Sequence, residues 1–144
     1  MRLEDIRKMA QEDSVIDNTE LDLESLKLPQ LHNKYLNIYH DEKLFLLKTE
    51  SDLKKAIRIK WEYYTGKLDE DSLEELGLEP FPLKILKQDL DKYLESDDDI
   101  IELNHKYIYQ KEKVEYVESV LKELTNRHWK IRNAIEWRKF VSGV

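Results

Sequence analysis

The stretch that decides the fold is residues 97–141, which read DDDIIELNHKYIYQKEKVEYVESVLKELTNRHWKIRNAIEWRKFV. Apolar side chains recur at alternating spacings of three and four residues, with no glycine or proline between them, and this pattern predicts one amphipathic helix. Ser96 is the predicted N-cap, with its hydroxyl accepting the amide proton of Asp99, and three aspartates suit the positive end of the helix dipole. The predicted seam residues are Ile100, Leu103, Tyr107, Val114, Val117, Leu121, Leu124, His128, Ile131 and Ile135.

The length of this helix suggests that its seam meets other copies of the chain. A helix of 45 residues is about 68 Å long, whereas a compact chain of 144 residues has a radius of gyration near 15 Å. We therefore expect partner helices to cover the seam, and the polar positions Gln110, His128 and Arg138 favour an assembly broader than a two-stranded zipper. The alternative is an ordinary amphipathic helix that packs over the core of its own chain.

The rest of the chain also favours helices. The predicted elements are helices at 2–12, 21–28, 30–64 and 89–93, joined by an acidic segment at 68–79 and the sequence Pro80-Phe81-Pro82. Asn18 or Thr19 is the expected cap of the second helix, and Gly66 is expected to end the long central helix in a left-handed conformation. The predicted fold is all-α, with short N-terminal helices, one long central helix and a long heptad-patterned C-terminal helix.

The chain is expected to form one cooperative unit with three regions. Residues 1–67 form an N-terminal helical region that contains most of a cluster of basic side chains, 68–82 form an acidic and proline-containing connection, and 83–144 form a helical oligomerisation region. A chain of 144 residues is about the size of one domain.

Composition limits the possible functions. The net charge of −7 argues against a polycation that coats nucleic acid indiscriminately, and the lack of cysteine excludes disulfides and thiolate metal sites. No stretch approaches 18 consecutive apolar residues, and the acidic N-terminus lacks the apolar core of a signal peptide. We expect a cytoplasmic protein that makes no contact with membranes.

No motif for catalysis or cofactor binding is present in the sequence. The histidines are scattered, and the pair Glu102 and His105 has no second such pair with which to form a di-iron site. The isolated glycines build no phosphate-binding loop. We therefore expect no enzymatic activity, no metal and no cofactor.

Positive charge concentrates near the end of the central helix. Residues 43–67 hold seven basic and three acidic side chains, a net charge of +4 in a chain of net −7. On a helical wheel, Lys54, Lys55, Arg58 and Trp61 fall within about 120° of one another. Cations one turn apart can follow a phosphate backbone and an exposed indole can stack on an unpaired base, so this face favours single-stranded nucleic acid over duplex.

Two other interpretations of this face remain. The lysines can form an ordinary solvated surface with Trp61 in the core, and Lys60 lies nearer the apolar side, where its stem can snorkel. A function of another class is an acidic helical scaffold that joins proteins and has no site for nucleic acid. That scaffold is favoured if Lys54, Arg58 and Lys60 pair with the acidic segment 68–79.

Four segments resemble a known family. The start MRLEDI, the segment 53–66 ending in WEYYTG, the run KILKQDLDKYLESDDDII and the tail NRHWKIRNAIEWRKFVSG are together similar to the UvsY-like recombination mediators of T-even-type phages. The similarity spans nearly the whole chain, but this sequence departs from the family pattern in the acidic segment 68–79 and at Pro29.

The resemblance implies a non-enzymatic ring of six or seven subunits, held together by the C-terminal helical region. It implies a role in recombination, repair and replication, in the cytoplasm of the infected host cell. The implied partners are single-stranded DNA, the phage recombinase and the phage single-strand-binding protein, which the recombinase replaces on DNA with the mediator's help. The family places DNA-binding basic residues at the positions of Arg58 and Lys60. The complete predicted DNA-binding set is Lys54, Lys55, Arg58, Lys60 and Trp61.

Overall fold

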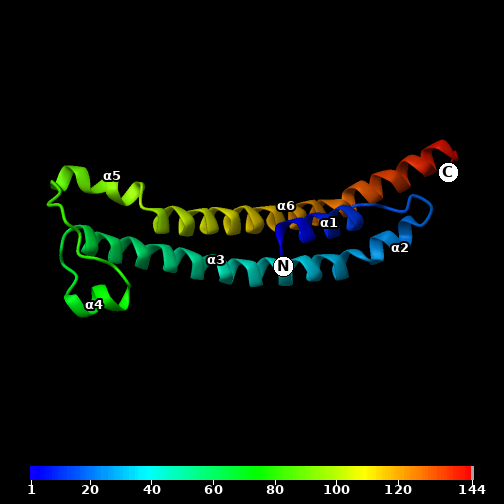
Figure 1. Ribbon diagram of the computed structural model, residues 1–144. Coiled ribbons are helices and arrows are strands. Elements are labelled where there is room, and N and C mark those ends of the chain that lie inside the picture. Colours follow the sequence, from blue (N-terminus) through cyan, green and yellow to red (C-terminus); the bar gives the residue numbers. More distant parts are fainter. Residues whose placement is uncertain (144) are drawn as a thin grey trace. The chain divides into compact units, whose positions relative to one another are not determined.

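The computed structural model describes residues 1–143, which form helices joined by irregular connections (Figure 1). In chain order these are α1 (Leu3–Asp13), α2 (Leu21–Leu26), α3 (Leu28–Tyr64), α4 (Glu70–Glu75), the 3-10 helix η1 (Lys87–Asp89), α5 (Leu90–Glu95) and α6 (Asp98–Val141), and the longest connection lies between α4 and α5. The described residues contain no strand, so the predicted all-α class is confirmed. None of their helices is long and apolar enough to cross a membrane.

The two long helices begin and end within two residues of their predicted bounds. Neither contains an interior proline or glycine, and Pro29 lies in the first turn of α3, where a missing N–H breaks no helical hydrogen bond. Gly66 ends α3 with a φ of 72°, and the Lys67 N–H donates to the Glu62 carbonyl at 2.8 Å. This left-handed glycine confirms the predicted stop.

Two predicted helix caps are wrong. Asp97 rather than Ser96 caps α6, because its Oδ1 accepts the Ile100 N–H at 3.1 Å while the Ser96 hydroxyl donates back to the Lys92 carbonyl. Glu20 stands at the start of α2 without a side-chain cap. The Thr19 amide and hydroxyl instead donate to Asp17, so this polar run forms a local turn.

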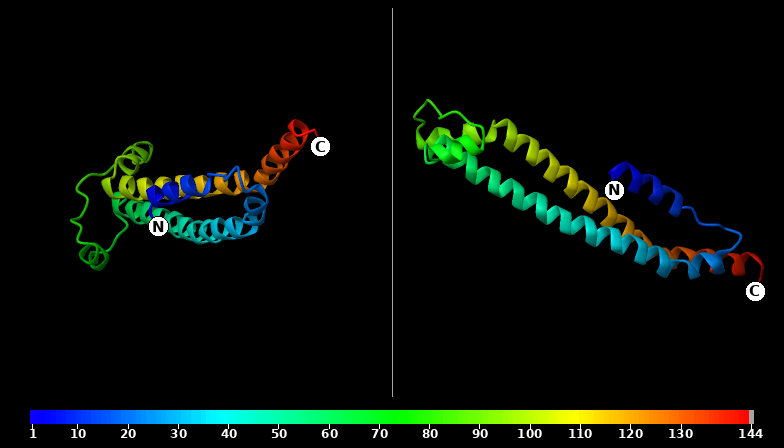
Figure 2. Two further views of the ribbon diagram at one scale, coloured as in Figure 1. Left: turned by 90° about the vertical axis from the view of Figure 1, so that its right-hand side faces the viewer. Right: turned by 60° about the horizontal axis from the view of Figure 1, so that its bottom comes forward.

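The chain forms two compact units. Unit 1 comprises Met1–Leu44 and Lys111–Val144, and unit 2 comprises Phe45–Gln110. Each unit contains one part of α3 and one part of α6, and within each unit these parts run antiparallel, as both views of Figure 2 show.

The core of unit 1 joins α1, the first half of α3 and the last part of α6. Its buried residues are Ile6, Ala10, Tyr35, Val117 and Leu124. The two residues that α1 contributes to this core, Ile6 and Ala10, lie about one helical turn apart, because only one face of this short helix meets the core. Burial of Ile6 and Ala10 explains why so short a helix is ordered.

Much of the predicted seam of α6 is covered within a single chain. Val114, Val117, Leu124 and Ile131 are buried in unit 1, and Ile100 is buried in unit 2. For these five residues the expectation that partner helices cover the seam is wrong, because α3 is itself 37 residues long and lies beside α6 in each unit. Leu103, Tyr107, Leu121 and Ile135 are partly exposed, and His128 is exposed. That the ten seam residues hold copies together remains a prediction.

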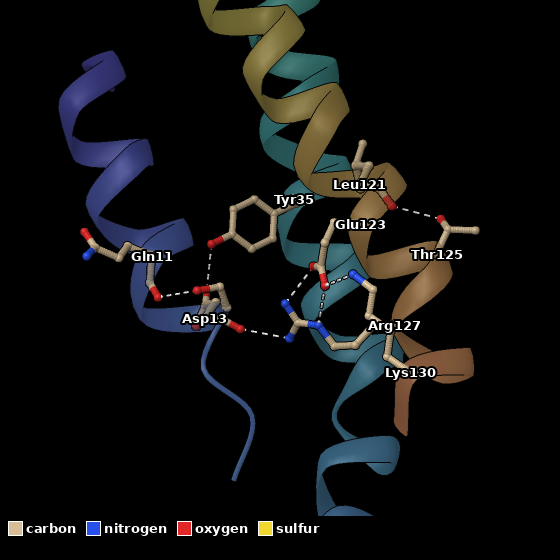
Figure 3. A network of polar contacts seen from close by, with 9 residues as sticks. Gln11, Asp13, Tyr35, Leu121, Glu123, Thr125, Arg127 and Lys130 are labelled. Carbon is tan, nitrogen blue, oxygen red and sulfur yellow. Dashed lines mark hydrogen bonds and ion pairs between the residues drawn. The ribbon is translucent and has the colours of Figure 1, made fainter. Parts of the chain in front are cut away.

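A polar network closes the core of unit 1 (Figure 3). The carboxylate of Asp13 accepts from the Tyr35 hydroxyl and the Lys34 ammonium, each at 2.7 Å. The buried guanidinium of Arg127 donates to the Asp13 carbonyl at 2.8 Å and binds the Glu123 carboxylate through two nitrogens. These bonds tie the end of α1 to both long helices.

Candidate nucleic-acid interface

The predicted DNA-binding residues lie on the part of α3 that belongs to unit 2. Lys54, Lys55 and Arg58 are exposed, and Trp61 is 37% exposed, so the interpretation of Trp61 as a core residue is excluded. Because 54, 58 and 61 are spaced by four and three residues, Lys54, Arg58 and Trp61 form one stripe along the helix, within roughly 60° of arc. Lys55 flanks this stripe, and we call these four residues the basic stripe.

The basic stripe carries positive charge that residues 1–143 leave largely without a partner. Lys54 pairs with Glu50 at 3.3 Å, but both side chains are well exposed, and such a pair contributes little. Lys55 and Arg58 have no ion pair among residues 1–143. Two cations are thus available for an anionic ligand.

Lys60, the fifth predicted residue, lies elsewhere. It follows Arg58 by two residues, which places it about 200° around the helix, and only 13% of its side chain is exposed. Its ammonium lies 2.8 Å from an Asp99 oxygen and 3.3 Å from Asp97 Oδ2. Its contact with DNA remains a prediction. In the structure the ammonium is paired with two carboxylates, which a phosphate would have to displace.

Asp97 is the centre of this second polar network. Its side chain is 5% exposed, and its Oδ2 also accepts from the Tyr64 hydroxyl at 2.6 Å. Together with the Ile100 amide on Oδ1, the carboxylate receives donors on both oxygens. The network joins the last turns of α3 to the first turn of α6 within unit 2, and so holds the helix that carries the basic stripe.

The electrostatics of this network favour the ionised pair. Burial alone raises the pKa of Asp97, but the hydrogen bonds from Tyr64 and Ile100, together with the Lys60 ammonium, lower it overall. Burial likewise opposes the charge on Lys60, but Asp99 and Asp97 raise its pKa above the usual value. Burial and donation to Asp97 raise the pKa of Tyr64, which therefore stays protonated.

The acidic segment 68–79 does not mask the basic stripe. Lys54 pairs within α3 and Lys60 pairs with α6, and no ion pair in the described part of the chain joins this segment to Lys54, Arg58 or Lys60. The segment forms α4, where Asp69 caps the helix by accepting the Ser72 amide at 2.7 Å. The ion pairs that would favour the scaffold interpretation are therefore absent from residues 1–143.

Beyond the predicted residues, the structure places further cations near Trp61. The Lys67 ammonium lies 4.1 Å from the centroid of the Trp61 ring, a cation–π contact. Trp61 and Lys67 also line a pocket together with Lys84 and Lys87. The sequence did not predict the roles of Lys84 and Lys87, because Lys84 lies within an irregular segment and Lys87 directly after it, and no periodicity predicts the path of that segment.

The described residues contain no group of three or more histidine, cysteine, aspartate or glutamate side chains suited to a metal ion. The candidate site is a surface of exposed cations beside the exposed ring of Trp61, groups that suit contact with phosphates and bases.

Comparison with known proteins shows the family to which this chain is similar. Residues 9–144 match the family described as "Recombination, repair and ssDNA binding protein UvsY". The chain is 26% identical over 143 residues to the recombination protein uvsY of Enterobacteria phage T4, with 99% of each chain covered.

Crystal structures of the bacteriophage T4 recombination mediator protein UvsY have the same fold. The form called lattice type II has a TM-score of 0.87 and 25% identity, and covers 99% of this chain and 98% of that one. Lattice type IV has a TM-score of 0.85 and 25% identity, and covers 97% of this chain and 99% of that one.

Proposed function

Because the chain belongs to the UvsY family of recombination, repair and single-stranded-DNA-binding proteins, we propose that it is a phage recombination mediator that binds single-stranded DNA through the basic stripe. Its task is to load a phage recombinase onto DNA in place of the single-strand-binding protein. We place this work in the cytoplasm of the infected host cell and assign no catalytic step to the protein.

The unpaired charge of Lys55 and Arg58 beside the exposed Trp61 carries this proposal. The guanidinium and the ammonium neutralise phosphates, and the indole stacks on a base for roughly 1–3 kcal/mol. Stacking requires an unpaired base, so the same surface discriminates single strands from duplex. Lys54 adds charge, since its exposed pair with Glu50 is easily exchanged for a phosphate.

Lys60 supports the site from the inner side of the helix. Its pairing with Asp97 and Asp99 offsets one of two negative charges that otherwise lower the positive potential of α3. We propose that Lys60 acts on DNA binding mainly through this neutralisation. A direct contact requires the ammonium to leave both carboxylates.

An assembly of six or seven copies turns weak individual stripes into a strong site. Two or three phosphate contacts in one protomer give modest affinity, but several protomers that hold one strand raise the effective concentration of each further contact. We propose that residues 83–144 build this assembly, and that the partly exposed seam residues contribute to it. Light scattering should give six or seven times the mass of one chain.

The direct test uses two double variants with the same change in charge. Lys55→Gln/Arg58→Gln removes the unpaired cations of the stripe. The control Lys8→Gln/Lys111→Gln removes two exposed lysines of unit 1 that have no ion pair among residues 1–143. With a fluorescent thymidine oligonucleotide at about 0.1 M salt, we expect the first variant to bind about tenfold more weakly than the control.

The mediator role is tested in the same series. On single-stranded DNA covered by the phage single-strand-binding protein, the wild type should raise the ATPase rate of the phage recombinase, and Lys55→Gln/Arg58→Gln should not. Equal DNA affinity of the two double variants contradicts the assignment of the stripe. A stimulation that survives loss of DNA binding contradicts the proposed mechanism.

A further inference from the structure

A pocket opens beside Trp61 at the end of the basic stripe. Its volume is about 790 Å³, which falls within the roughly 300–1,000 Å³ of small-ligand sites. It lies wholly in unit 2, between the end of α3 and the segment that leads to α5. No function is assigned to it by the proposals above.

The charged lining of this pocket has a single sign. Lys67, Lys84 and Lys87 line it, and none of its lining residues is acidic, although the chain carries a net charge of −7. Lys84 and Lys87 are exposed and have no ion pair among residues 1–143. The pocket therefore concentrates positive potential where an anionic group can enter.

The other lining groups are flat and apolar. Trp61 contributes its indole, and the exposed side chains of Leu83 and Leu86 contribute aliphatic surface. Phe81, which also lines the pocket, is fixed by edge-to-face packing against the rings of Tyr64 at 5.0 Å and Tyr93 at 5.6 Å. A preformed apolar wall beside three cations matches a nucleobase attached to phosphates.

The pocket continues the basic stripe. Thr65, which lines the pocket, comes directly after the end of α3, and its amide still donates to the Trp61 carbonyl at 3.1 Å, so it continues the row of Lys54, Arg58 and Trp61 by one turn. Trp61 belongs to both surfaces. A strand that follows the cations of α3 therefore reaches the pocket next.

We propose that this pocket takes one unstacked nucleotide of the bound strand, with its base against Trp61 and Leu86 and its flanking phosphates at Lys84 and Lys87. This inference rests on the proposed binding of single-stranded DNA and extends the site beyond α3. Lys67, held over the indole, supplies a third cation at the base-binding wall. An acidic peptide of a partner protein could also occupy the pocket. Peptide binding, however, would not explain why the pocket lies next to the basic stripe.

The test follows the fluorescence of Trp61 in the full chain with Trp129→Phe and Trp137→Phe, both of which replace exposed residues. The probes are an oligothymidylate and an abasic deoxyribose-phosphate oligomer of equal length. We expect the oligothymidylate to quench the fluorescence and the abasic oligomer to leave it nearly unchanged. Lys84→Gln/Lys87→Gln should bind the oligothymidylate about tenfold more weakly than Lys8→Gln/Lys111→Gln.

The outcomes separate this inference from the proposed function. If Lys55→Gln/Arg58→Gln loses affinity while Lys84→Gln/Lys87→Gln binds and quenches like the control, the pocket proposal is overturned and the basic stripe stands. If the wild type binds neither probe, both proposals fail. If Lys84→Gln/Lys87→Gln keeps its affinity for DNA but loses its association with the phage single-strand-binding protein, the pocket holds a peptide and the nucleotide proposal is overturned.

Discussion

The two units contain polar networks with the same chemistry but different surroundings. In unit 1, Asp13 accepts from Lys34 and Tyr35, and in unit 2, Asp97 accepts from Lys60 and Tyr64. The Asp13 side chain is 25% exposed and that of Asp97 only 5%.

The difference between the networks bears on where the proposed binding site lies. The network of unit 1 joins three helices around a core, and Arg127, the further cation it contains, is buried and bound to Glu123. The network of unit 2 satisfies Lys60 on the inner side of α3 and leaves Arg58, two residues earlier, exposed. One lysine stabilises the helix, so that its neighbours can present unpaired charge on a rigid support.

The largest difference between the networks should appear when each aspartate is removed. Asp97→Ala leaves the nearly buried Lys60 ammonium with one carboxylate and takes the cap from α6, so the free energy of unfolding should fall by about 3–5 kcal/mol. Asp13→Ala should cost about 1–3 kcal/mol, because its site is more open to water. Urea unfolding followed by circular dichroism measures both.

The matched control for Asp97→Ala is its exposed neighbour, Asp98→Ala, which should change the free energy of unfolding by no more than about 0.5 kcal/mol. An equal loss for Asp97→Ala and Asp98→Ala would show that the network contributes nothing beyond helix-terminal charge.

A smaller effect is expected from the two tyrosine hydroxyls. Tyr35→Phe and Tyr64→Phe each remove one hydrogen bond to a carboxylate, which should cost about 0.5–1.5 kcal/mol. Tyr107→Phe is the control, because its hydroxyl has no hydrogen bond among the described residues. Thermal or urea unfolding of the three variants measures these losses of stability. If only one of Tyr35→Phe and Tyr64→Phe is less stable than the control, the two networks do not stabilise their units in the same way.

The pH dependence of stability sharpens the comparison further. The pKa values of Asp13 and Asp97 are lowered in the folded state from 3.8, so each contributes stability above that pH, which is lost as pH falls through the lowered value. The pKa of Lys60 is raised from 10.5, so its contribution is present below that pH and is lost as pH rises through the raised value.

Urea midpoints of the wild type and Asp97→Asn, measured from pH 7 to pH 2, test the acid limb. The difference between the two proteins should be largest at pH 7 and shrink below about pH 4. A constant difference across this range would mean that the ionised form of Asp97 is not the one stabilised by folding.

The long helices could be predicted from the sequence because their spacing runs unbroken for many turns. The cap of α6 could not. Ser96 and Asp97 both suit an N-cap, and the contacts of Asp97 with Lys60 and Tyr64, more than 30 residues away in sequence, decide between them. The coverage of the α6 seam was missed for a similar reason, since it depends on the pairing of α6 with α3.

The candidate site was predictable in part. The wheel brought Lys54, Arg58 and Trp61 together, because all three lie on one helix. It could not show that the ammonium of Lys60 is paired with Asp99 and Asp97, nor that Lys84 and Lys87 share a pocket with Trp61. Those contacts depend on tertiary packing, which helical spacing does not predict.

The central claim is that the unpaired cations of α3 contact DNA phosphates while Lys60 is occupied within the protein. The slope of log K against log salt measures this most directly, because each phosphate contact on a single strand contributes about −0.7. The account predicts that Lys55→Gln/Arg58→Gln makes the slope shallower by about 1.4 per protomer, and that folded Lys60→Gln keeps the wild-type slope even if its affinity falls. A wild-type slope in the double variant, or a shallower slope in Lys60→Gln, would contradict it.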